Sequence, residues 1–254
     1  MAALNVSFSA CGFLGIYQLG AVGAILRHGD RLLASLRACA GASAGALVAA
    51  VLITAPDKLE HCKDFTYKFA ADVRRQKLGA LTPGYDFMQA LRSGMEDILP
   101  SNAHTVAGDR LWVSITHAKS GENSIVCRFS SRDELIMALL ASSFVPVYAG
   151  LRPVDFRGQK WIDGGFSDGL PILPTGRTIT VSPFAGPGLD VCPPHSGPSR
   201  RQFRHANMNI LLSVDNVVRL NQALFPPPAH RLRSLCQQGE EDAVRFLKKE
   251  GWHR

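Results

Sequence analysis

The pattern of apolar and polar positions near the start of the chain predicts a strand, a loop and a helix, twice over. Alternating apolar residues over 4–8 predict a strand, and a mostly apolar stretch over 16–28 that ends at a glycine predicts a helix. The unit repeats with a buried strand over 36–40 and a buried helix over 46–54, which Pro56 ends. This succession of strand, turn and helix predicts an α/β fold with a mainly parallel sheet.

Further along, the same patterns predict three more helices and four more strands. The helices are expected over 57–76, over 86–99 and from a capping box at Ser131 and Glu134 to about residue 141, and the strands over 111–116, 124–129, 156–162 and 178–181. Five prolines and three glycines between 183 and 199 predict a linker. We therefore expect a body over 1–182, a Pro/Gly-rich linker over 183–206 and a helical C-terminal extension over 207–254, with helices over 207–224 and 230–249.

Composition places the chain among globular proteins. Its 254 residues are 46% apolar and 19% charged, which gives enough apolar surface for a core and excludes intrinsic disorder. The net charge is +7, from 28 Lys and Arg against 21 Asp and Glu. Residues 200–254 hold 10 of the basic and 5 of the acidic side chains, so most of the excess lies in the predicted extension. We expect this charge to meet a lipid surface, because the basic residues lack the interleaved aromatics and reading motifs of nucleic-acid binding.

The cysteines and the N-terminus favour an intracellular, cytoplasmic location. Six scattered cysteines form no CxxC pair and no cluster at zinc-ligand spacing, which is typical of reduced thiols. The N-terminus lacks the basic start and apolar core of a signal peptide. The longest nearly uncharged stretches, 11–26 and 41–55, are shorter than a spanning helix needs. Contact with membranes or lipid droplets is therefore expected to be peripheral.

The residues Gly41-Ala42-Ser43-Ala44-Gly45 fit G-x-S-x-G, the nucleophile elbow, between a predicted buried strand and a buried helix. A serine on such a sharp turn projects its hydroxyl away from the backbone, and the turn tolerates only small neighbours. The helix that follows points its free N–H groups and the positive end of its dipole at the place where an oxyanion would form. A tight turn that holds a serine by chance is the alternative interpretation.

A second glycine turn, Ala10-Cys11-Gly12-Phe13-Leu14-Gly15, follows the first predicted strand. It is not a Walker A loop, since no Lys-Ser or Lys-Thr pair follows it, and it lacks a glycine of the dinucleotide fingerprint. Such a loop can instead present backbone N–H groups beside Ser43, as the other half of an oxyanion hole.

The third motif is Asp163-Gly164-Gly165, at the end of a strand-like run. The motif is a common turn, but because an elbow lies upstream, Asp163 becomes a candidate base for Ser43. Ser167-Asp168-Gly169 has similar local chemistry and is interpreted as a plain turn. A Ser-Asp-His order would need a histidine after Asp163, and His195, His205, His230 and His253 all lie beyond the predicted core strands. A Ser43–Asp163 dyad is therefore preferred, with Asp163 made more basic by a dry site.

Together the three motifs resemble the patatin-like phospholipase family, and its neutral-lipid branch in particular. Further stretches that match the branch are Thr82-Pro83-Gly84-Tyr85-Asp86-Phe87, Ala141-Ser142-Ser143-Phe144-Val145-Pro146 and Asn221-Gln222-Ala223-Leu224-Phe225-Pro226. The resemblance covers essentially the whole chain. It departs from the wider family at Leu14, where plant and bacterial members carry Arg or Lys, and from the larger lipases of the branch at Ala10, where they carry Gly.

The resemblance implies a three-layer α/β/α fold, a Ser43–Asp163 dyad, and no metal or organic cofactor. It also implies that N–H groups near Gly12, Phe13 and Ala44 form the oxyanion hole. The motif glycines are Gly15, Gly41, Gly45, Gly164 and Gly165. The implied substrates are acyl esters of lipids, namely triacylglycerol, retinyl ester and phospholipid, with acyl transfer to water or to an alcohol.

Two other functions stay open from the sequence. One is a weakly active or inactive protein that binds lipid or the surface of lipid droplets, and the other is a hydrolase assisted by His205 or His230. A stripe of apolar residues in the last predicted helix also has two interpretations. It either packs on its own domain or lies on a membrane surface. The stripe consists of Leu232, Leu235, Cys236, Ala243, Phe246 and Leu247.

Overall fold

A seven-stranded sheet forms the centre of the computed structural model, which describes residues 3–194 and 201–253. The strands are β1 (Leu4–Phe8), β2 (Leu36–Ala42), β3 (Leu111–His117), β4 (Asn123–Val126), β5 (Val154–Phe156), β6 (Gln159–Asp163) and β7 (Arg177–Val181). Their order is β5-β6-β3-β2-β1-β7, and β4 also pairs with β3. The four strands β7, β1, β2 and β3 are parallel, whereas the pairings of β3 with β4, of β3 with β6 and of β6 with β5 at the other edge are antiparallel.

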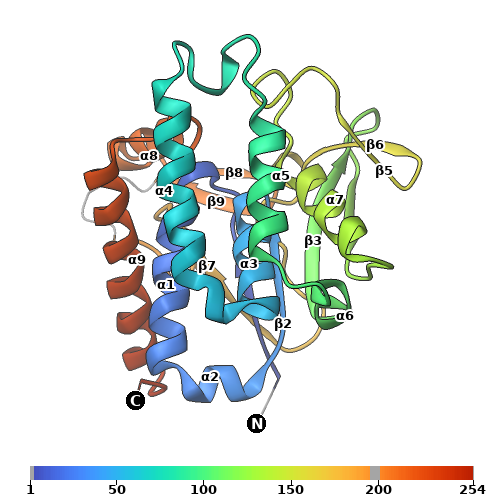
Figure 1. Cartoon of the computed structure of the whole chain (residues 1–254). Helices are drawn as coiled ribbons and strands as arrows, with labels where there is room; N and C mark the ends of the chain where they lie inside the picture. The colour runs from blue at the N-terminus through green and yellow to red at the C-terminus, as the bar shows by residue number, and fades with distance from the viewer. Residues whose placement is uncertain (1–2, 195–200, 254) are drawn as a thin grey trace.

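Helices flank this sheet. They are α1 (Gly15–His28), α2 (Asp30–Ser35), α3 (Ala44–Thr54), α4 (Leu59–Arg75), α5 (Phe87–Ile98), α6 (Ala103–Ala107), α7 (Arg132–Ser143), α8 (Val214–Leu224) and α9 (Ala229–Lys249). Figure 1 shows α1, α3, α4 and α5 side by side in front of the sheet. The predicted α/β fold with a mainly parallel sheet is confirmed, and the arrangement is consistent with three α/β/α layers.

Local sequence explains where several elements begin and end. Ser131 accepts a hydrogen bond from the N–H of Glu134 at 3.1 Å, so the predicted cap of α7 forms. Asp86 caps α5 in the same way. The run predicted as one strand over 156–162 is a hairpin instead, because Arg157 and Gly158 both have positive φ and turn the chain between β5 and β6. The short helices α2 and α6 were not predicted.

The C-terminal part differs from its predicted structure at one point. Residues 208–211, predicted as the start of a helix, form strand β9 (Met208–Leu211), which pairs with β8 (Gln202–His205). Ala206 and Asn207 both have positive φ, the conformation of a tight hairpin turn. The helix α8 begins only at Val214, where Ser213 caps it.

The predicted linker contacts the body where it is described. Phe184 and Ala185 are buried, and Val191 forms a parallel bridge with Val181. Residues 195–200 of that segment lie outside the described residues. The boundary at 182 stays a prediction.

The helix α9 packs along α1 through two glycines. A Cβ on Gly20 would lie 1.9 Å from the carbonyl oxygen of Cys236, and one on Gly239 would lie 1.9 Å from that of Tyr17. The Tyr17 hydroxyl donates to Asp242 at 2.7 Å, a buried hydrogen bond that ties the two helices together. The apolar stripe of α9 is buried in this contact, so it packs on its own domain.

We expect alanine at Gly20 to destabilise the protein, because its Cβ meets backbone that cannot move aside without separating α1 from α9. The free energy of unfolding should fall by about 3 kcal/mol, as for an overpacked core. Gly23, on the same helix, is the matched control, since a Cβ there meets only side-chain ends at 3.5 Å. Gly23→Ala should raise stability by up to about 1 kcal/mol through helix propensity. Urea unfolding measures both, and equal stability of the two variants would contradict the close contact.

Candidate active site

The turn that holds Ser43 lies between the C-terminal end of β2 and the start of α3. Ser43 has φ 56° and ψ −132°, a strained conformation for a residue with a side chain. The neighbouring glycines make the turn sterically feasible. A Cβ on Gly41 would lie 2.4 Å from the backbone of Gly45, and a Cβ on Gly45 would lie 2.3 Å from the Phe8 carbonyl oxygen. The sequence motif therefore corresponds to a true elbow.

A residue outside the three motifs fixes this turn. The Ser142 hydroxyl accepts a hydrogen bond from the N–H of Ser43 at 2.9 Å and donates its own proton to the Ser114 carbonyl oxygen at 2.6 Å. The N–H of Ser43 is thus engaged by the protein. Ser142 lies 99 residues from Ser43 in the chain, so no local motif links the two.

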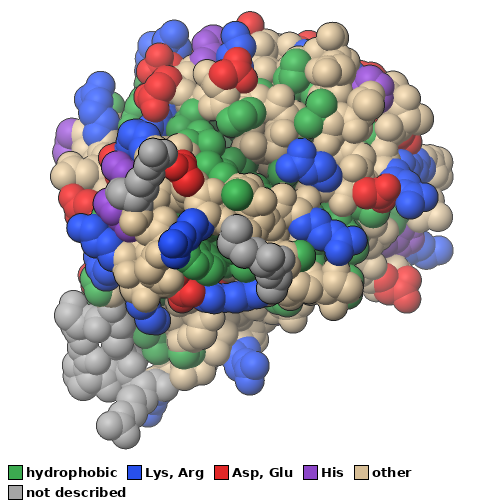
Figure 2. Space-filling model, turned by 90° about the horizontal axis from the view of Figure 1, so that it is seen from below, with side chains coloured by type: hydrophobic (Ala, Val, Ile, Leu, Met, Phe, Trp, Pro, Cys, Tyr) green, Lys and Arg blue, Asp and Glu red, His purple; other side chains and the backbone are tan. Residues whose placement is uncertain are grey.

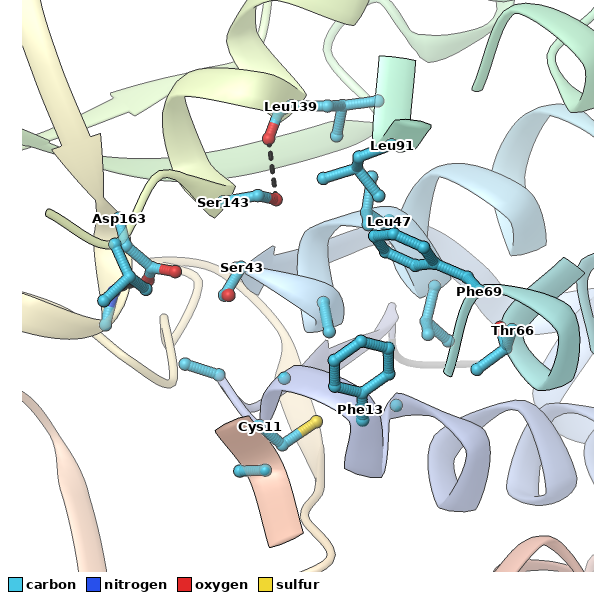
Figure 3. A pocket seen from close by; sticks show the side chains of 18 of the residues that line it. Cys11, Phe13, Ser43, Leu47, Thr66, Phe69, Leu91, Leu139, Ser143 and Asp163 are labelled. Carbon is cyan, nitrogen blue, oxygen red and sulfur yellow. Dashed lines mark hydrogen bonds between the residues drawn. The ribbon is translucent and has the colours of Figure 1, made fainter. Parts of the chain in front are cut away.

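The register of the sheet brings Asp163 to Ser43. Ala42 pairs with Ser114 on β3, and the next residue of β3, Ile115, pairs with Asp163 on the other side. Only one strand therefore separates the two residues, and the Ser43 hydroxyl lies close enough to the Asp163 carboxylate to affect its pKa. Figure 3 shows the two side chains facing one another at one end of a pocket.

Burial sets the electrostatics of Asp163. The side chain is removed from water, which raises the pKa of Asp163 to about 6, although the nearby Ser43 hydroxyl and a hydrogen bond from the N–H of Gly165 at 2.7 Å oppose the rise. Its backbone is held by the Phe144 carbonyl oxygen and the Thr116 hydroxyl, each at 2.8 Å. The result is a fixed carboxylate that is more basic than an ordinary aspartate and still ionised at neutral pH.

The glycine loop after β1 lies beside the elbow. Gly12 begins a short 3₁₀ helix, Gly12–Leu14, with φ +53°, and Phe13 follows in the same turn. A Cβ on Gly15 would lie 3.2 Å from that of Ala44, the first residue of α3. First-turn N–H groups of a helix have no partner within the helix, so both segments can offer donors to the space at Ser43.

The remaining motif glycines also mark close approaches. A Cβ on Gly164 would lie 2.1 Å from the Ser114 carbonyl oxygen, and one on Gly165 would lie 3.0 Å from the Cβ of Ala10. The three sequence motifs thus meet in space. Asp168, by contrast, accepts hydrogen bonds from Leu170 and Asn207, as expected for a plain turn.

A pocket of about 450 Å³ opens at this meeting point. Ser43, Ala44, Gly12, Phe13 and Asp163 line one end. From there the pocket continues between α3, α4 and α5, where its lining is mostly aliphatic and aromatic. Side chains of this part, some of which Figure 3 shows, include Leu47, Val51, Phe69, Leu91, Met95 and Ile98.

The histidines do not complete a triad in the described part of the chain. His205 lines the pocket from β8 but bonds to neither Ser43 nor Asp163, and His230 is outside the lining. Within residues 3–194 and 201–253, no group of three or more His, Cys, Asp or Glu could hold a metal ion. All six cysteines are free thiols.

Comparisons with known proteins agree with this geometry. The model of the family described as patatin-like phospholipase matches residues 6–175. The chain is 59% identical over 249 residues to human patatin-like phospholipase domain-containing protein 4, covering 98% of both chains. It is 38% identical to human omega-hydroxyceramide transacylase over 96% of this chain and 46% of that protein. VipD from Legionella pneumophila is similar in fold alone, with a TM-score of 0.51 and 14% identity over 98% of this chain and 67% of that one.

The raised pKa of Asp163 predicts a pH-dependent effect of Asp163→Asn on stability. Between about pH 4 and 6 the folded protein binds a proton that the unfolded chain releases, so the stability from this group is lost as pH rises through 6. Asparagine does not ionise, so the variant does not lose this stability. The variant should gain up to about 3 kcal/mol relative to wild type between pH 4 and pH 7, measured by urea unfolding. The exposed Asp57→Asn is the control, and a difference that does not change with pH would contradict the raised pKa.

Proposed function

Because the chain belongs to the patatin-like phospholipase family, as its motifs predicted, we propose that it is a serine acyl hydrolase that acts on lipid esters and can also transfer the acyl group to an alcohol. Family membership supports lipid acyl-ester hydrolysis or acyl transfer as the general activity. The proposal adds the residues that perform the reaction and the class of ester.

Ser43 is the nucleophile and Asp163 the general base of the proposed mechanism. The Asp163 carboxylate takes the hydroxyl proton of Ser43 while Oγ attacks the ester carbonyl carbon. The resulting oxyanion is held by N–H groups of Gly12, Phe13 and Ala44. When the carbon–oxygen bond to the alcohol breaks, the protonated Asp163 returns its proton to that alcohol, which leaves an acyl-serine.

The second half of the reaction repeats these steps with a new nucleophile. Water or an acceptor alcohol gives its proton to Asp163 and attacks the acyl-serine, and the proton returns to Ser43 as the product leaves. The observation that carries the proposal is that the Ser43 side chain faces a buried aspartate, Asp163, whose pKa is about 6. This pKa keeps the carboxylate ionised at neutral pH while raising its basicity.

The pocket supports a long acyl chain as the bound group. Its volume of roughly 450 Å³ lies within the range of about 300–1,000 Å³ that is typical of small-molecule sites. The lining beyond Ser43 is mostly apolar, which favours an acyl chain over a polar substrate. Triacylglycerol, retinyl ester and phospholipid all carry such chains and are the proposed substrates. Human omega-hydroxyceramide transacylase is named for acyl transfer, which supports an alcohol as a second acceptor.

We place the protein inside the cell, in the cytoplasm, in peripheral contact with membranes or lipid droplets. Its free cysteines support a reducing compartment. No helix in the described part of the chain is long and apolar enough to cross a membrane. The mechanism requires no metal or organic cofactor, because side-chain and backbone groups supply each step.

Ser43→Ala and Asp163→Asn should each lower ester hydrolysis by on the order of a thousandfold or more, because each removes a group that acts only together with the other. In wild type, kcat/KM should rise with pH through about 6, as Asp163 ionises. A fluorophosphonate probe should label wild type and not Ser43→Ala. An unlabelled wild type that hydrolyses no lipid ester would favour an inactive lipid-binding protein, and loss of activity in His205→Ala or His230→Ala would favour histidine assistance.

A larger side chain deep in the pocket should change the preference for acyl-chain length. Val51 lines the pocket eight residues along α3 from Ser43, about 12 Å at the rise of a helix. Val51→Phe should leave kcat/KM for a butyryl ester within about twofold and lower it on the order of tenfold for a palmitoyl ester. Rates for both esters, measured with the wild type in parallel, test this. An equal effect on the two esters would contradict the assignment of the acyl chain to this pocket.

A further inference from the structure

The helix α8 has its polar and apolar faces reversed. Asn216 and Arg219 are buried, whereas Val214, Val217 and Leu220 are 79%, 60% and 50% exposed. Asn216 is held inside by the backbone of Ala185 and by the Leu211 carbonyl oxygen. A helix on the surface of a water-soluble protein normally buries its apolar side. The outward face of α8 is thus suited to an apolar environment.

Two connections beside α8 continue this apolar face. Leu78 and Leu81 are exposed between α4 and α5, and Val147 and Leu151 are exposed between α7 and β5. Figure 1 shows both connections and α8 at the upper end of the molecule, away from the two termini.

Hydrogen bonds tie the connection between α7 and β5, and the last turn of α4, to the end of α8 and the residues that follow it. The Tyr148 hydroxyl donates to the Leu224 carbonyl oxygen at 2.7 Å, and the Arg74 guanidinium donates to that of Pro226 at 2.8 Å. We call the exposed apolar residues of α8 and of the two connections the α8 surface.

The α8 surface adjoins the active-site pocket. Leu220 is half exposed and also lines that pocket, as do Leu224 and Tyr148 nearby. On its inner side α8 contacts the glycine loop, since a Cβ on Gly12 would lie 2.2 Å from the Ala223 carbonyl oxygen. The α8 surface and the pocket therefore share Leu220, which is exposed on one side and lines the pocket on the other.

Positive charge accompanies this surface. The segments 74–86, 144–153 and 201–230 carry six exposed basic side chains, against the two acidic side chains Asp86 and Asp215. The basic residues are Arg74, Arg75, Lys77, Arg152, Arg201 and Arg204, of which Arg75 forms an ion pair with Asp72, just outside these segments. At the opposite end of the molecule, which Figure 2 shows from below, Lys and Arg side chains are interspersed with Asp and Glu side chains. Apolar side chains with a basic excess are complementary to a lipid surface that carries anionic headgroups.

We propose that the α8 surface docks the protein on a lipid surface with anionic headgroups and places the pocket entrance against it. The proposal rests on the proposed function only for the substrate drawn from that surface, because docking itself needs neither Ser43 nor Asp163. The exposed valines enter the headgroup region, and the basic side chains pair with lipid phosphates and carboxylates.

Vesicle flotation of the inactive Ser43→Ala protein tests the docking apart from catalysis. Large vesicles of phosphatidylcholine alone are compared with vesicles of equal parts phosphatidylcholine and phosphatidylserine. Binding should be stronger to the second and should weaken with added salt. Val214→Gln with Val217→Gln should lower the partition coefficient on the order of tenfold. The control is Ile172→Gln, since Ile172 is 58% exposed but lies outside the α8 surface.

The charge is tested in the same way with a matched pair of double variants. Lys77→Gln with Arg152→Gln should lower binding to the anionic vesicles by on the order of tenfold and leave binding to phosphatidylcholine unchanged. Arg37→Gln with Lys58→Gln removes two exposed basic side chains from the opposite end and should change neither.

Several outcomes would overturn the proposal. They are equal binding of the valine variant and its control, equal binding to both kinds of vesicle, or a dimer in the absence of lipid that the valine substitutions dissociate. Hydrolysis of a soluble butyryl ester by the protein with native Ser43 separates the two hypotheses. Hydrolysis without vesicle binding refutes the docking surface alone, and vesicle binding without hydrolysis refutes the proposed function alone.

Discussion

The pairing of Ser43 with Asp163, whose side chains face one another, is the constraint on which the rest of the site depends. It joins a serine in a strained backbone conformation to a carboxylate removed from water, and both states are unfavourable in isolation. Chain connectivity places Ser43, and the register of the sheet places Asp163. Ser43 follows β2 directly, whereas Asp163 reaches it across β3, and Ser142 fixes the elbow from α7. The strands β2 and β3 and the helix α7 thus together hold Ser43 and Asp163 in these unfavourable states.

Close backbone contacts extend this arrangement to the C-terminal helices. The helix α8 lies against Gly12, and α9 lies against α1, which begins at the end of the glycine loop. Both contacts need glycine because a carbonyl oxygen occupies the place of a Cβ. The segment after residue 200 therefore lines the active-site pocket, and it also packs against the glycine loop and α1. A displacement of α8 would therefore act directly on Gly12, one of the proposed oxyanion donors.

The sequence predicted what short motifs encode and missed what distant residues create. Ser43 and Asp163 are recognisable because each stands at the end of a strand and among glycines that its turn requires. The parallel strands were predicted because β1 and β2 repeat one strand–turn–helix pattern. Ser142 lies in a stretch that matches the family branch, but its contact with Ser43 was not predicted, because that role arises only from packing between distant parts of the chain. The hairpin of β8 and β9 was not predicted, because its strands are short and follow a Pro/Gly-rich segment, so the alternation of their side chains was not recognised.

The reversed faces of α8 connect the electrostatics of the site with its surroundings. Asp163 is more basic than an ordinary aspartate because its surroundings exclude water, and that exclusion must persist while an ester enters. An entrance open to bulk water would rehydrate the carboxylate and lower its pKa. In the proposed docked state, an entrance lined by apolar side chains and placed against lipid admits the substrate from a phase that is itself dry. The outer face of α8 then preserves the desolvation that makes Asp163 a base, while its inner face supports the loop at Gly12.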